Sequence, residues 1–264
     1  MRAPTSIYRE RLPIPALADH VLCVWSQVIA AGETVHRHRV LPDGCADLVW
    51  IGEAPAVVAG PATRPVLVPL APRTTVVGVR LRPGAAVMLG PPANALSNHD
   101  TPLGDIWGAD PLSGRIAEQG AIKARLAAAE AALARRLADA APPDRGIVAA
   151  TRWLARHPVG RIGDLAGFLD TSPRLLHRRF MAVVGYGPKT FQRVLRLQRV
   201  LALAARSQHE SLAALAADAG YADQAHMSRE VRALTGQSPG VLLQGARSTL
   251  ALSDLFKTEP APVL

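Results

Sequence analysis

Two stretches of the chain place arginine, histidine and amide side chains along one side of a predicted helix, where they could hydrogen-bond to the edges of DNA bases. The first helix is predicted to begin at Ser172 and Pro173, because serine caps free N–H groups and a proline there loses no hydrogen bond. Leu176, Phe180 and Val183 recur at spacings of four and three, which predicts a packed side. The opposite side carries the base-reading candidates Arg174, His177 and Arg178.

The second stretch, residues 216–243, has the order of parts of a helix-turn-helix. A short alanine-rich helix is followed by a turn at Gly220, a helix from about Asp223 and a stop at Gly236. With Met227 turned inward, the outward positions are Gln224, Ala225, Ser228 and Arg229. Arginine can bridge two acceptors of guanine, glutamine suits adenine, and alanine suits the methyl group of thymine. Both stretches therefore predict base reading.

One helix is predicted to connect the two stretches, over residues 189–206. At about 1.5 Å per residue it would be roughly 27 Å long, which could place two reading helices in successive major grooves about 34 Å apart. Phosphate contacts outnumber base contacts in protein–DNA complexes, so some of the arginines above are also candidates for holding the backbone. The best phosphate candidates are Ser172, Arg193 and Arg196.

Positive charge is concentrated in the same region. Residues 144–246 hold fourteen Lys or Arg and seven Asp or Glu, whereas the whole chain has 30 and 21 and a formal net charge of +9. Release of counterions from phosphates makes such a surplus favourable for DNA binding. The alternative is a solvated basic surface on an ordinary helical domain, which the paired motifs disfavour.

Both stretches resemble the DNA-binding domain of the AraC/XylS family of transcription regulators, over about residues 144–246. The segments GYADQAH-M-R, TGQSP, S-R-L-R-F and G-GPK all occur in the order that the family shows. The resemblance implies a domain with two helix-turn-helix units, double-stranded promoter DNA and RNA polymerase as partners, and the same set of base-reading residues.

The length of 264 residues predicts two domains, each large enough for a core of its own. Cys23 and Cys45 are the only cysteines and do not suggest a disulfide framework. The N-terminal residues lack an apolar signal core, and no run of about 18 uncharged apolar residues occurs. We therefore expect a soluble, cytoplasmic protein with no membrane partner and no cofactor.

Residues 1–111 have a different sequence pattern, in which short β-rich runs are separated by proline and glycine. The predicted strands are 20–29, 34–41, 46–51, 56–59, 66–70 and 74–81. Helical segments 84–89 and 92–96 follow, and residues 102–108 are predicted to form a closing loop. The pattern predicts a small β-barrel or sandwich. The segments RVLPDGCADLVW and VGVRLRPGAA resemble the sensor-like N-terminal domain of one AraC-type subgroup, over about residues 8–110.

Five side chains in this half are candidates for holding a small organic ligand: Trp25, Asp43, Trp50, Arg80 and Arg82. The aromatic rings could line an apolar pocket, and the charged groups could orient a polar ligand. The alternative is structural, with the tryptophans in the core, the aspartate in a tight Asp-Gly turn and an Arg–Asp pair beside it.

Two histidines are weak candidates for a metal site. His36 and His38 lie two apart on a predicted strand and would face the same side. Two imidazoles do not make a stable site, so Asp43, Cys45 or His99 would have to complete it. Because the spacing is unlike any closed zinc motif, we expect a polar edge strand and no metal.

Residues 112–143 are predicted to form a helical connector followed by a linker. An apolar stripe recurs at helical spacing: Ile122, Leu126, Ala129, Leu133 and Leu137. The stripe must pack either against the chain's own β-rich domain or against the same helix of a second copy, and we favour the homodimer. Residues 247–264 are predicted to be a frayed tail.

The predicted fold is a two-domain α+β protein. It consists of a β-barrel-like or sandwich-like domain (1–111), a helical connector (112–143) and an all-α domain with two helix-turn-helix units (144–246), followed by the tail. The predicted function is sequence-specific DNA binding in transcription regulation, with an N-terminal domain that either responds to a small-molecule effector, which then controls the regulator, or holds the dimer.

Two alternatives stay open. Similar DNA-binding domains occur fused to an alkyl-accepting domain for DNA repair, but that chemistry needs clustered thiolates on zinc, which two distant cysteines do not supply. A purely architectural DNA-binding protein would show no sequence preference. No phosphate-binding loop, nucleophile elbow or metalloprotease signature supports an enzyme.

Overall fold

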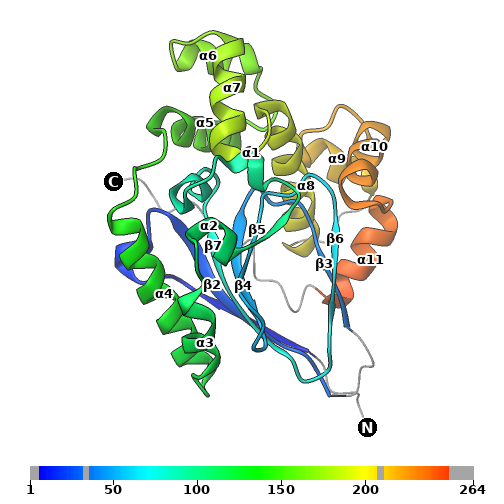
Figure 1. The fold of residues 1–264 in the computed structure, drawn as a ribbon. Helices are drawn as coiled ribbons and strands as arrows, with labels where there is room; N and C mark the ends of the chain where they lie inside the picture. Colours follow the sequence, from blue (N-terminus) through cyan, green and yellow to red (C-terminus); the bar gives the residue numbers. More distant parts are fainter. Residues whose placement is uncertain (1–5, 32–35, 207–210, 250–264) are drawn as a thin grey trace.

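The computed structural model describes residues 6–31, 36–206 and 211–249. A β-rich part comes first along the chain, and the helices α3 (Pro111–Ala117) and α4 (Ile122–Ala138) follow it (Figure 1). The rest of the described chain, from α5 (Arg145–Arg156) onward, is helical. The expected order of a β-rich domain, a helical connector and an all-α part is therefore confirmed.

Six strands form one open antiparallel sheet, in the order β1-β2-β7-β4-β5-β8. They are β1 (Ile7–Arg11), β2 (Val21–Val28), β4 (Ala46–Ile51), β5 (Val57–Ala59), β7 (Thr75–Leu81) and β8 (Asp100–Pro102). A separate two-stranded sheet pairs β3 (His36–Val40) with β6 (Val66–Leu70). In the part of the chain that the structure describes, β1 and β8 do not pair with each other, so the sheet does not close into the barrel that the sequence suggested.

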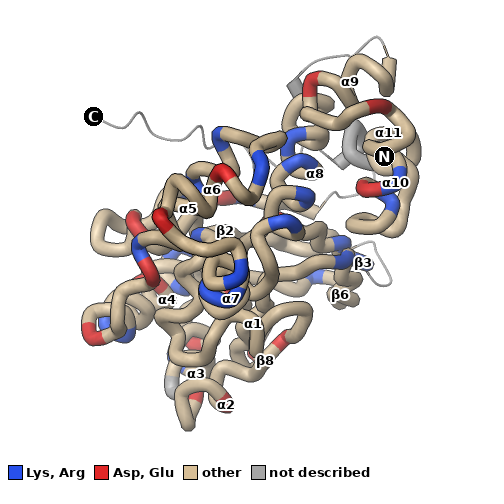
Figure 2. The backbone as a smooth tube through the Cα atoms, turned by 90° about the horizontal axis from the view of Figure 1, so that it is seen from above, with Lys and Arg blue, Asp and Glu red and all other residues tan. Residues whose placement is uncertain are grey.

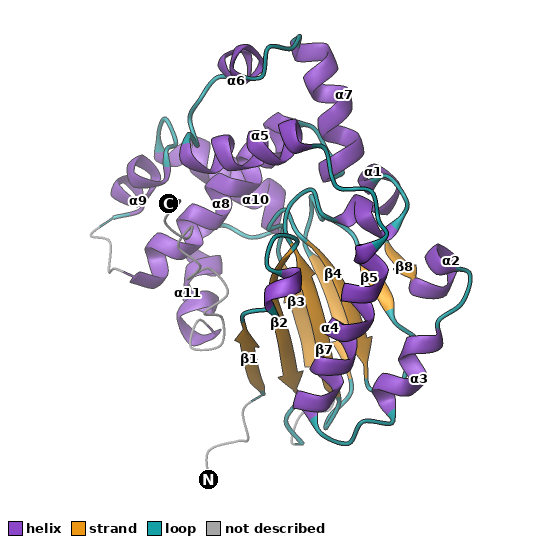
Figure 3. Ribbon diagram, turned by 90° about the vertical axis from the view of Figure 1, so that its left-hand side faces the viewer, coloured by secondary structure: helices purple, strands orange, loops and turns teal. Residues whose placement is uncertain are grey.

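Helix α4 lies across one face of the six-stranded sheet (Figure 3). Alternate residues of β4, among them Leu48 and Trp50, share a core with the apolar stripe of α4. The stripe residues Leu126, Ala129, Leu133 and Leu137 are each at most 8% exposed. Each fully buried leucine stabilises the fold by about 1.5–3 kcal/mol. The chain's own sheet covers the stripe. The stripe therefore does not support the expected homodimer.

The opposite face of the sheet carries a buried polar group beside a small apolar cluster. Trp25 on β2 lies opposite Gly78 on β7, where an added Cβ would be 2.3 Å from the indole ring. The ring therefore lies directly on the backbone of β7. Its Nε1 donates to Asp47 Oδ1 at 2.7 Å, and the same oxygen accepts from Arg80 Nε at 3.1 Å.

Helix α8 runs through the middle of the helical part. The helices after α5 are α6 (Ile162–Phe168), α7 (Pro173–Val184), α8 (Pro188–Arg206), α9 (Leu212–Ala219), α10 (Gln224–Thr235) and α11 (Pro239–Thr249). Phe191, Val194, Leu197 and Val200 on α8 are at most 1% exposed, and α8 packs against α5, α7, α9, α10 and α11. No helix among the described residues is long and apolar enough to span a membrane.

Several elements differ from the prediction. The edge strands β1 and β8 were missed because β1 has no buried residue and β8 is short and ends on a proline. Residues 102–108, expected to form a loop, contain helix α2 (Leu103–Trp107), and the connector is broken into α3 and α4 near Gly120. The remaining short helices are η1 (Pro15–Leu17), η2 (Ala86–Leu89) and α1 (Ala93–Leu96).

The β-rich part contacts the helical part at several points. Helices η2 and α1 pack against α7. On the neighbouring two-stranded sheet, the Arg39 guanidinium donates to the Thr235 carbonyl at 3.1 Å. The Gln198 side-chain amide on α8 donates to the Pro42 carbonyl. The two reading units are therefore both in contact with the N-terminal part.

Gly78→Ala should lower the free energy of unfolding by about 1–3 kcal/mol, because the added methyl group would overlap the Trp25 ring. Gly114→Ala in α3 is the control, since nothing lies within 4 Å of an added Cβ there and alanine favours a helix. Denaturant unfolding measures both variants. Wild-type stability of Gly78→Ala would show that the ring does not need the bare backbone of β7.

Candidate nucleic-acid interface

The first helix-turn-helix unit consists of α6, a turn and α7. The Ser172 hydroxyl accepts from the Leu175 N–H at 3.2 Å, which confirms the predicted N-cap. Leu176 and Phe180 are fully buried and Val183 is 8% exposed, so the packed side is the one that the spacing predicts.

The outward side of α7 is open to solvent. Arg174, His177 and Arg178 are exposed there, and over the described ranges none of the three forms an ion pair or a side-chain hydrogen bond. The adjacent Arg179 differs, because it donates two hydrogen bonds of 2.8 Å to Asp144. Since Asp144 also caps α5, Arg179 ties α7 to α5 and is not free to contact DNA.

The second unit consists of α9, a turn at Gly220 and α10. Gly220 has a φ of +86°, a left-handed conformation that favours glycine, and it ends α9 as predicted. Asp223 caps α10 by accepting from the His226 N–H at 2.6 Å. Met227 is fully buried, which confirms the predicted inward position. On the other side, Gln224, Ala225 and Arg229 are exposed and Ser228 is half-buried.

The phosphate role expected of Arg196 does not agree with its position. Arg196 is 5% exposed, and its guanidinium contacts the Glu230 carboxylate at 2.7 Å. The guanidinium carbon also lies 5.2 Å from the centre of the Tyr221 ring, in a cation–π contact. A guanidinium that contacts a carboxylate at its edge and a ring at its face has little room for a phosphate. Arg196 instead fixes α10 against α8.

Glu230 is the residue that the sequence analysis missed. Its carboxylate also contacts Arg193 Nε at 3.3 Å and His226 Nε2 at 3.4 Å. The spacing of four between His226 and Glu230 was the only local signal for this cluster. The side chain of Arg193 is 32% exposed, so this arginine can still reach a phosphate while it contacts Glu230.

The electrostatics of this cluster reflect its burial. Burial and, to a smaller extent, the nearby Glu230 carboxylate raise the pKa of Tyr221 to about 12, against the opposing effect of Arg196. The Tyr221 hydroxyl has no hydrogen-bond partner among the described residues. Tyr221 therefore stays neutral at physiological pH and presents a ring, rather than a charge, to Arg196.

The predicted ligand set in the β-rich part is only partly brought together. Trp25, Asp43 and Arg80 meet on one face of the sheet, where Arg80 Nε lies 3.6 Å from the Asp43 carboxylate. Although burial lowers the pKa of Arg80, the charges of Asp47 and Asp43 raise it well above its ordinary value. These groups satisfy one another, which is the structural alternative.

The other two members of that set lie elsewhere. Trp50 belongs to the core on the α4 side of the sheet. Arg82 Nε donates to the Ala18 carbonyl at 3.0 Å. The five residues therefore do not line one common pocket.

The histidines and cysteines that the structure describes do not form a metal site. The side chain of His36 lies outside the described residues, and within them no group of three His, Cys, Asp or Glu could hold a metal ion. His38 has interactions within the described residues. Burial raises the pKa of Cys23 to about 12 and that of Cys45 well above its ordinary value. Thiols that stay protonated are poor nucleophiles.

Figure 2 shows Lys and Arg residues gathered along α7 and α8. Arg174 and Arg178 on α7 and Arg199 on α8 are exposed. A concentration of cations along these two helices is the electrostatic arrangement that a phosphate backbone favours.

Family models match two separate parts of the chain. Residues 165–245 match a model described as a helix-turn-helix domain. Residues 9–102 match a model described as a domain of unknown function, DUF6597. No curated protein sequence matches the chain. The C-terminal part is therefore a DNA-binding helix-turn-helix domain, and it is of the AraC type.

Some solved structures are similar to the chain at low identity. ToxT from Vibrio cholerae is 12% identical with a TM-score of 0.46, over 90% of this chain and 98% of ToxT. The DNA-binding domain of the global transcriptional factor AdpA, solved with a target DNA, is 20% identical with a TM-score of 0.38, over 42% and 100%. The C-terminal domain of AraT, a response regulator from Geobacillus stearothermophilus, is 19% identical with a TM-score of 0.37, over 39% and 86%. Similarity at this level places no ligand and no DNA sequence on this chain.

Arg196→Ala should destabilise the protein by about 2–4 kcal/mol, because it leaves the largely buried Glu230 carboxylate without its closest partner. Arg199→Ala is the matched control, since Arg199 is an exposed arginine of the same helix. Thermal unfolding of both variants checks this. A loss of DNA affinity without any loss of stability in Arg196→Ala would restore its phosphate role.

The Asp144–Arg179 pair should make stability depend on pH. Hydrogen bonds from Arg179 hold the pKa of Asp144 below its ordinary value. The stabilisation by this pair is therefore complete above pH ~3.9, the ordinary pKa of an aspartate, and is lost as the pH falls through the lower pKa of the folded protein. Asp144→Asn keeps a cap but removes the charge. The wild type should therefore be the more stable protein near neutral pH, and the difference should shrink below pH ~4. A difference that stays constant over a pH series would contradict the ion pair as its source.

Proposed function

We propose that the chain, whose C-terminal part is a helix-turn-helix domain of the AraC type, is a transcription regulator that reads promoter DNA with α7 and α10. The observation that carries the proposal is the arrangement of two capped helices on either side of one buried helix, each with its polar side turned to solvent. In complexes with two such units, the second helix of each unit enters a major groove.

The length of α8 supports simultaneous binding by both units. Its 19 residues give roughly 28 Å at about 1.5 Å per residue, close to the ~34 Å that separates major grooves on one face of DNA. A single copy of the chain could therefore contact two successive grooves. This matters because the covered stripe on α4 removes the argument for a dimer through that helix.

We assign base reading to the outward-facing residues in the first half of each reading helix: Arg174, His177 and Arg178 on α7, and Gln224, Ala225, Ser228 and Arg229 on α10. Arg193 and the N-terminal end of α7 at Ser172 are proposed to contact phosphates, because a helix N-terminus and a partly exposed cation both favour an anion. Arg196 is left out of this set and becomes a positioning residue.

We further propose that residues 1–111 form the effector-responsive unit, that 112–143 connect it to the DNA-binding unit, and that 144–246 form the DNA-binding unit. The direct contacts of η2 and α1 with α7 support control of DNA binding by the N-terminal part. A regulator of this kind works in the cytoplasm, together with RNA polymerase at a promoter.

The repair alternative has less support. An alkyl acceptor needs an ionised and accessible thiolate, whereas Cys23 and Cys45 are 5% and 6% exposed, and burial raises the pKa of both thiols. The architectural alternative makes a different prediction for DNA: its affinity would be equal for every duplex of the same length.

Binding-site selection from random duplexes, followed by titration, tests the proposal. Arg178→Ala should weaken binding to the selected site by about 1–3 kcal/mol and relax the preference at one base pair, with a smaller effect on a scrambled duplex. Arg115→Ala is the control, because Arg115 is exposed on α3, far from α7 (Figure 1).

Two results of this experiment would count against the assignment. If the wild-type protein selects no sequence from random duplexes, the architectural alternative is correct. If Arg178→Ala loses equal affinity for the selected and the scrambled duplex, Arg178 contacts phosphate and not a base. Titrations at two salt concentrations separate these cases, because each lost phosphate contact lowers the salt dependence.

A further inference from the structure

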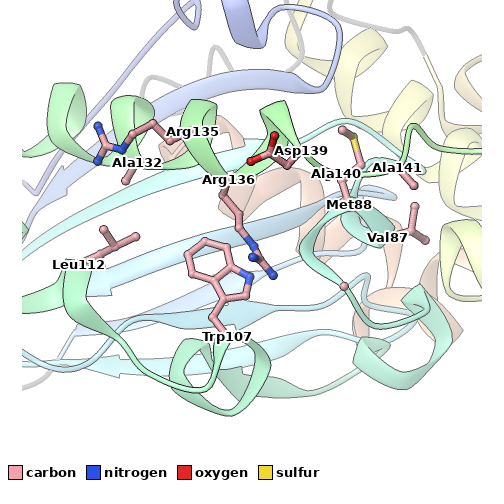
Figure 4. Close-up of a pocket in the computed structure, with 11 residues that line it drawn as sticks. Val87, Met88, Trp107, Leu112, Ala132, Arg135, Arg136, Asp139, Ala140 and Ala141 are labelled. Carbon is pink, nitrogen blue, oxygen red and sulfur yellow. The ribbon is translucent and has the colours of Figure 1, made fainter.

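A cavity of about 540 Å³ lies beside the C-terminal half of α4 (Figure 4). Its walls come from α4, from η2 and from the region of α2 and α3, and Ala140 and Ala141 after α4 line one end. Cavities that hold small organic molecules in proteins are about 300–1,000 Å³ and are mainly apolar with a few polar groups. The volume is therefore in the range of a ligand site, and it is separate from the Trp25–Arg80 group on the other face of the sheet.

The apolar wall of the cavity is held in place by a hydrogen bond. The Trp107 indole N–H donates to the Leu89 carbonyl at 3.0 Å, which fixes the ring. Met88 and Leu112 add further apolar surface, and Ala132 leaves space beneath α4. Together these side chains would contact the hydrocarbon portion of a ligand.

The charged groups of the cavity are two arginines and one aspartate. The Arg136 guanidinium lies over the Trp107 ring, 5.4 Å from its centre, and points into the space that the ring borders (Figure 4). Arg135 and Asp139 also line the cavity. Within the described ranges neither arginine has an ion-pair partner, so the lining carries one net positive charge that no protein group neutralises.

We propose that this cavity binds an organic monocarboxylate, with the carboxylate on Arg136 and the hydrocarbon portion against Trp107 and Met88. A guanidinium can donate two parallel hydrogen bonds to a carboxylate, and the exposed Arg136 can do so at the open side of the cavity while the apolar wall contacts the rest of the ligand. A neutral ligand of the same shape would leave the positive charge without a partner.

The cavity is also connected to the first reading helix by two segments. Val87 in η2 lines the cavity and packs against the cores of both the β-rich and the helical part. Ala140 and Ala141 line it too, and the chain then runs to Asp144, which holds Arg179 of α7. A ligand that moves η2 or the start of this linker would therefore act on α7. This regulatory half of the proposal rests on the proposed DNA-binding function, whereas the binding half does not.

A purely structural account explains some of these features. Arginines in the last turn of a helix interact favourably with its dipole, and an arginine over a tryptophan stabilises a surface. That account predicts that Arg136→Gln changes stability alone. The ligand proposal predicts a change in binding that depends on the charge of the ligand.

Isothermal titration calorimetry with phenylbutyrate and its neutral amide, phenylbutyramide, tests the binding half in the absence of DNA. Phenylbutyrate should bind about tenfold more tightly than the amide, and Arg136→Gln should abolish that difference. Lys123→Gln removes an exposed charge from the same helix outside the cavity and should leave both affinities unchanged. Ala141→Leu, at an exposed position that lines the cavity, should weaken both compounds by filling space.

The binding proposal is wrong if phenylbutyrate gives no binding heat at millimolar concentration, if the amide binds equally well, or if Arg136→Gln, shown by thermal unfolding to be folded, keeps the preference for the carboxylate. Hydrogen exchange of the DNA-free protein tests the connection to α7. Phenylbutyrate should slow exchange in η2 and in α7, and protection confined to α4 would overturn the regulatory half while leaving the site intact. Neither readout uses DNA, so a failure of the DNA-binding proposal would be seen separately.

Discussion

The burial of one side of α8 from Phe191 to Leu201 is the constraint on which the reading surface depends. Phe191, Val194, Leu197 and Val200 are almost inaccessible to solvent, and the helices of both units pack around them. A helix buried in this way cannot bend or rotate without opening the core of both units. The distance and orientation of α7 relative to α10 are therefore properties of α8, and the Arg196–Glu230 contact adds a polar restraint on α10 at the point where it crosses α8.

The same helix joins the helical part to the β-rich part. Gly44, in the turn before β4, lies so close to Phe191 that an added Cβ would be 2.7 Å from the ring. The preceding Pro42 carbonyl accepts from Gln198 on α8. Asp43 between them reaches back to Arg80 on the sheet. The charged group that the sequence suggested as a ligand site is thus better understood as an anchor, since it holds the turn that contacts α8.

The sequence predicted those features that local chemistry determines. The cap at Ser172, the start of α10 near Asp223 and the inward side of α7 could be read from neighbouring residues, because a cap or a spacing of three and four is complete within one turn of a helix. It failed where a partner lies far along the chain. The role of Arg196 depends on Glu230, which is 34 residues away. The apolar stripe of α4 is covered by strands of the sheet, and the sequence pattern does not say that these strands pack against it.

The contacts of the N-terminal part fall on the C-terminal ends of both reading helices. At α7, Gly185 lies against the Ala93 carbonyl, where an added Cβ would be 3.1 Å away. At α10, Arg39 donates to the Thr235 carbonyl. The residues proposed to read bases, such as Arg174 and Gln224, lie at the opposite, N-terminal ends, which are the ends that enter the groove in complexes of this type. The N-terminal part therefore contacts both helices without covering the ends proposed to contact DNA, so the regulation proposed above would not require the two parts to separate.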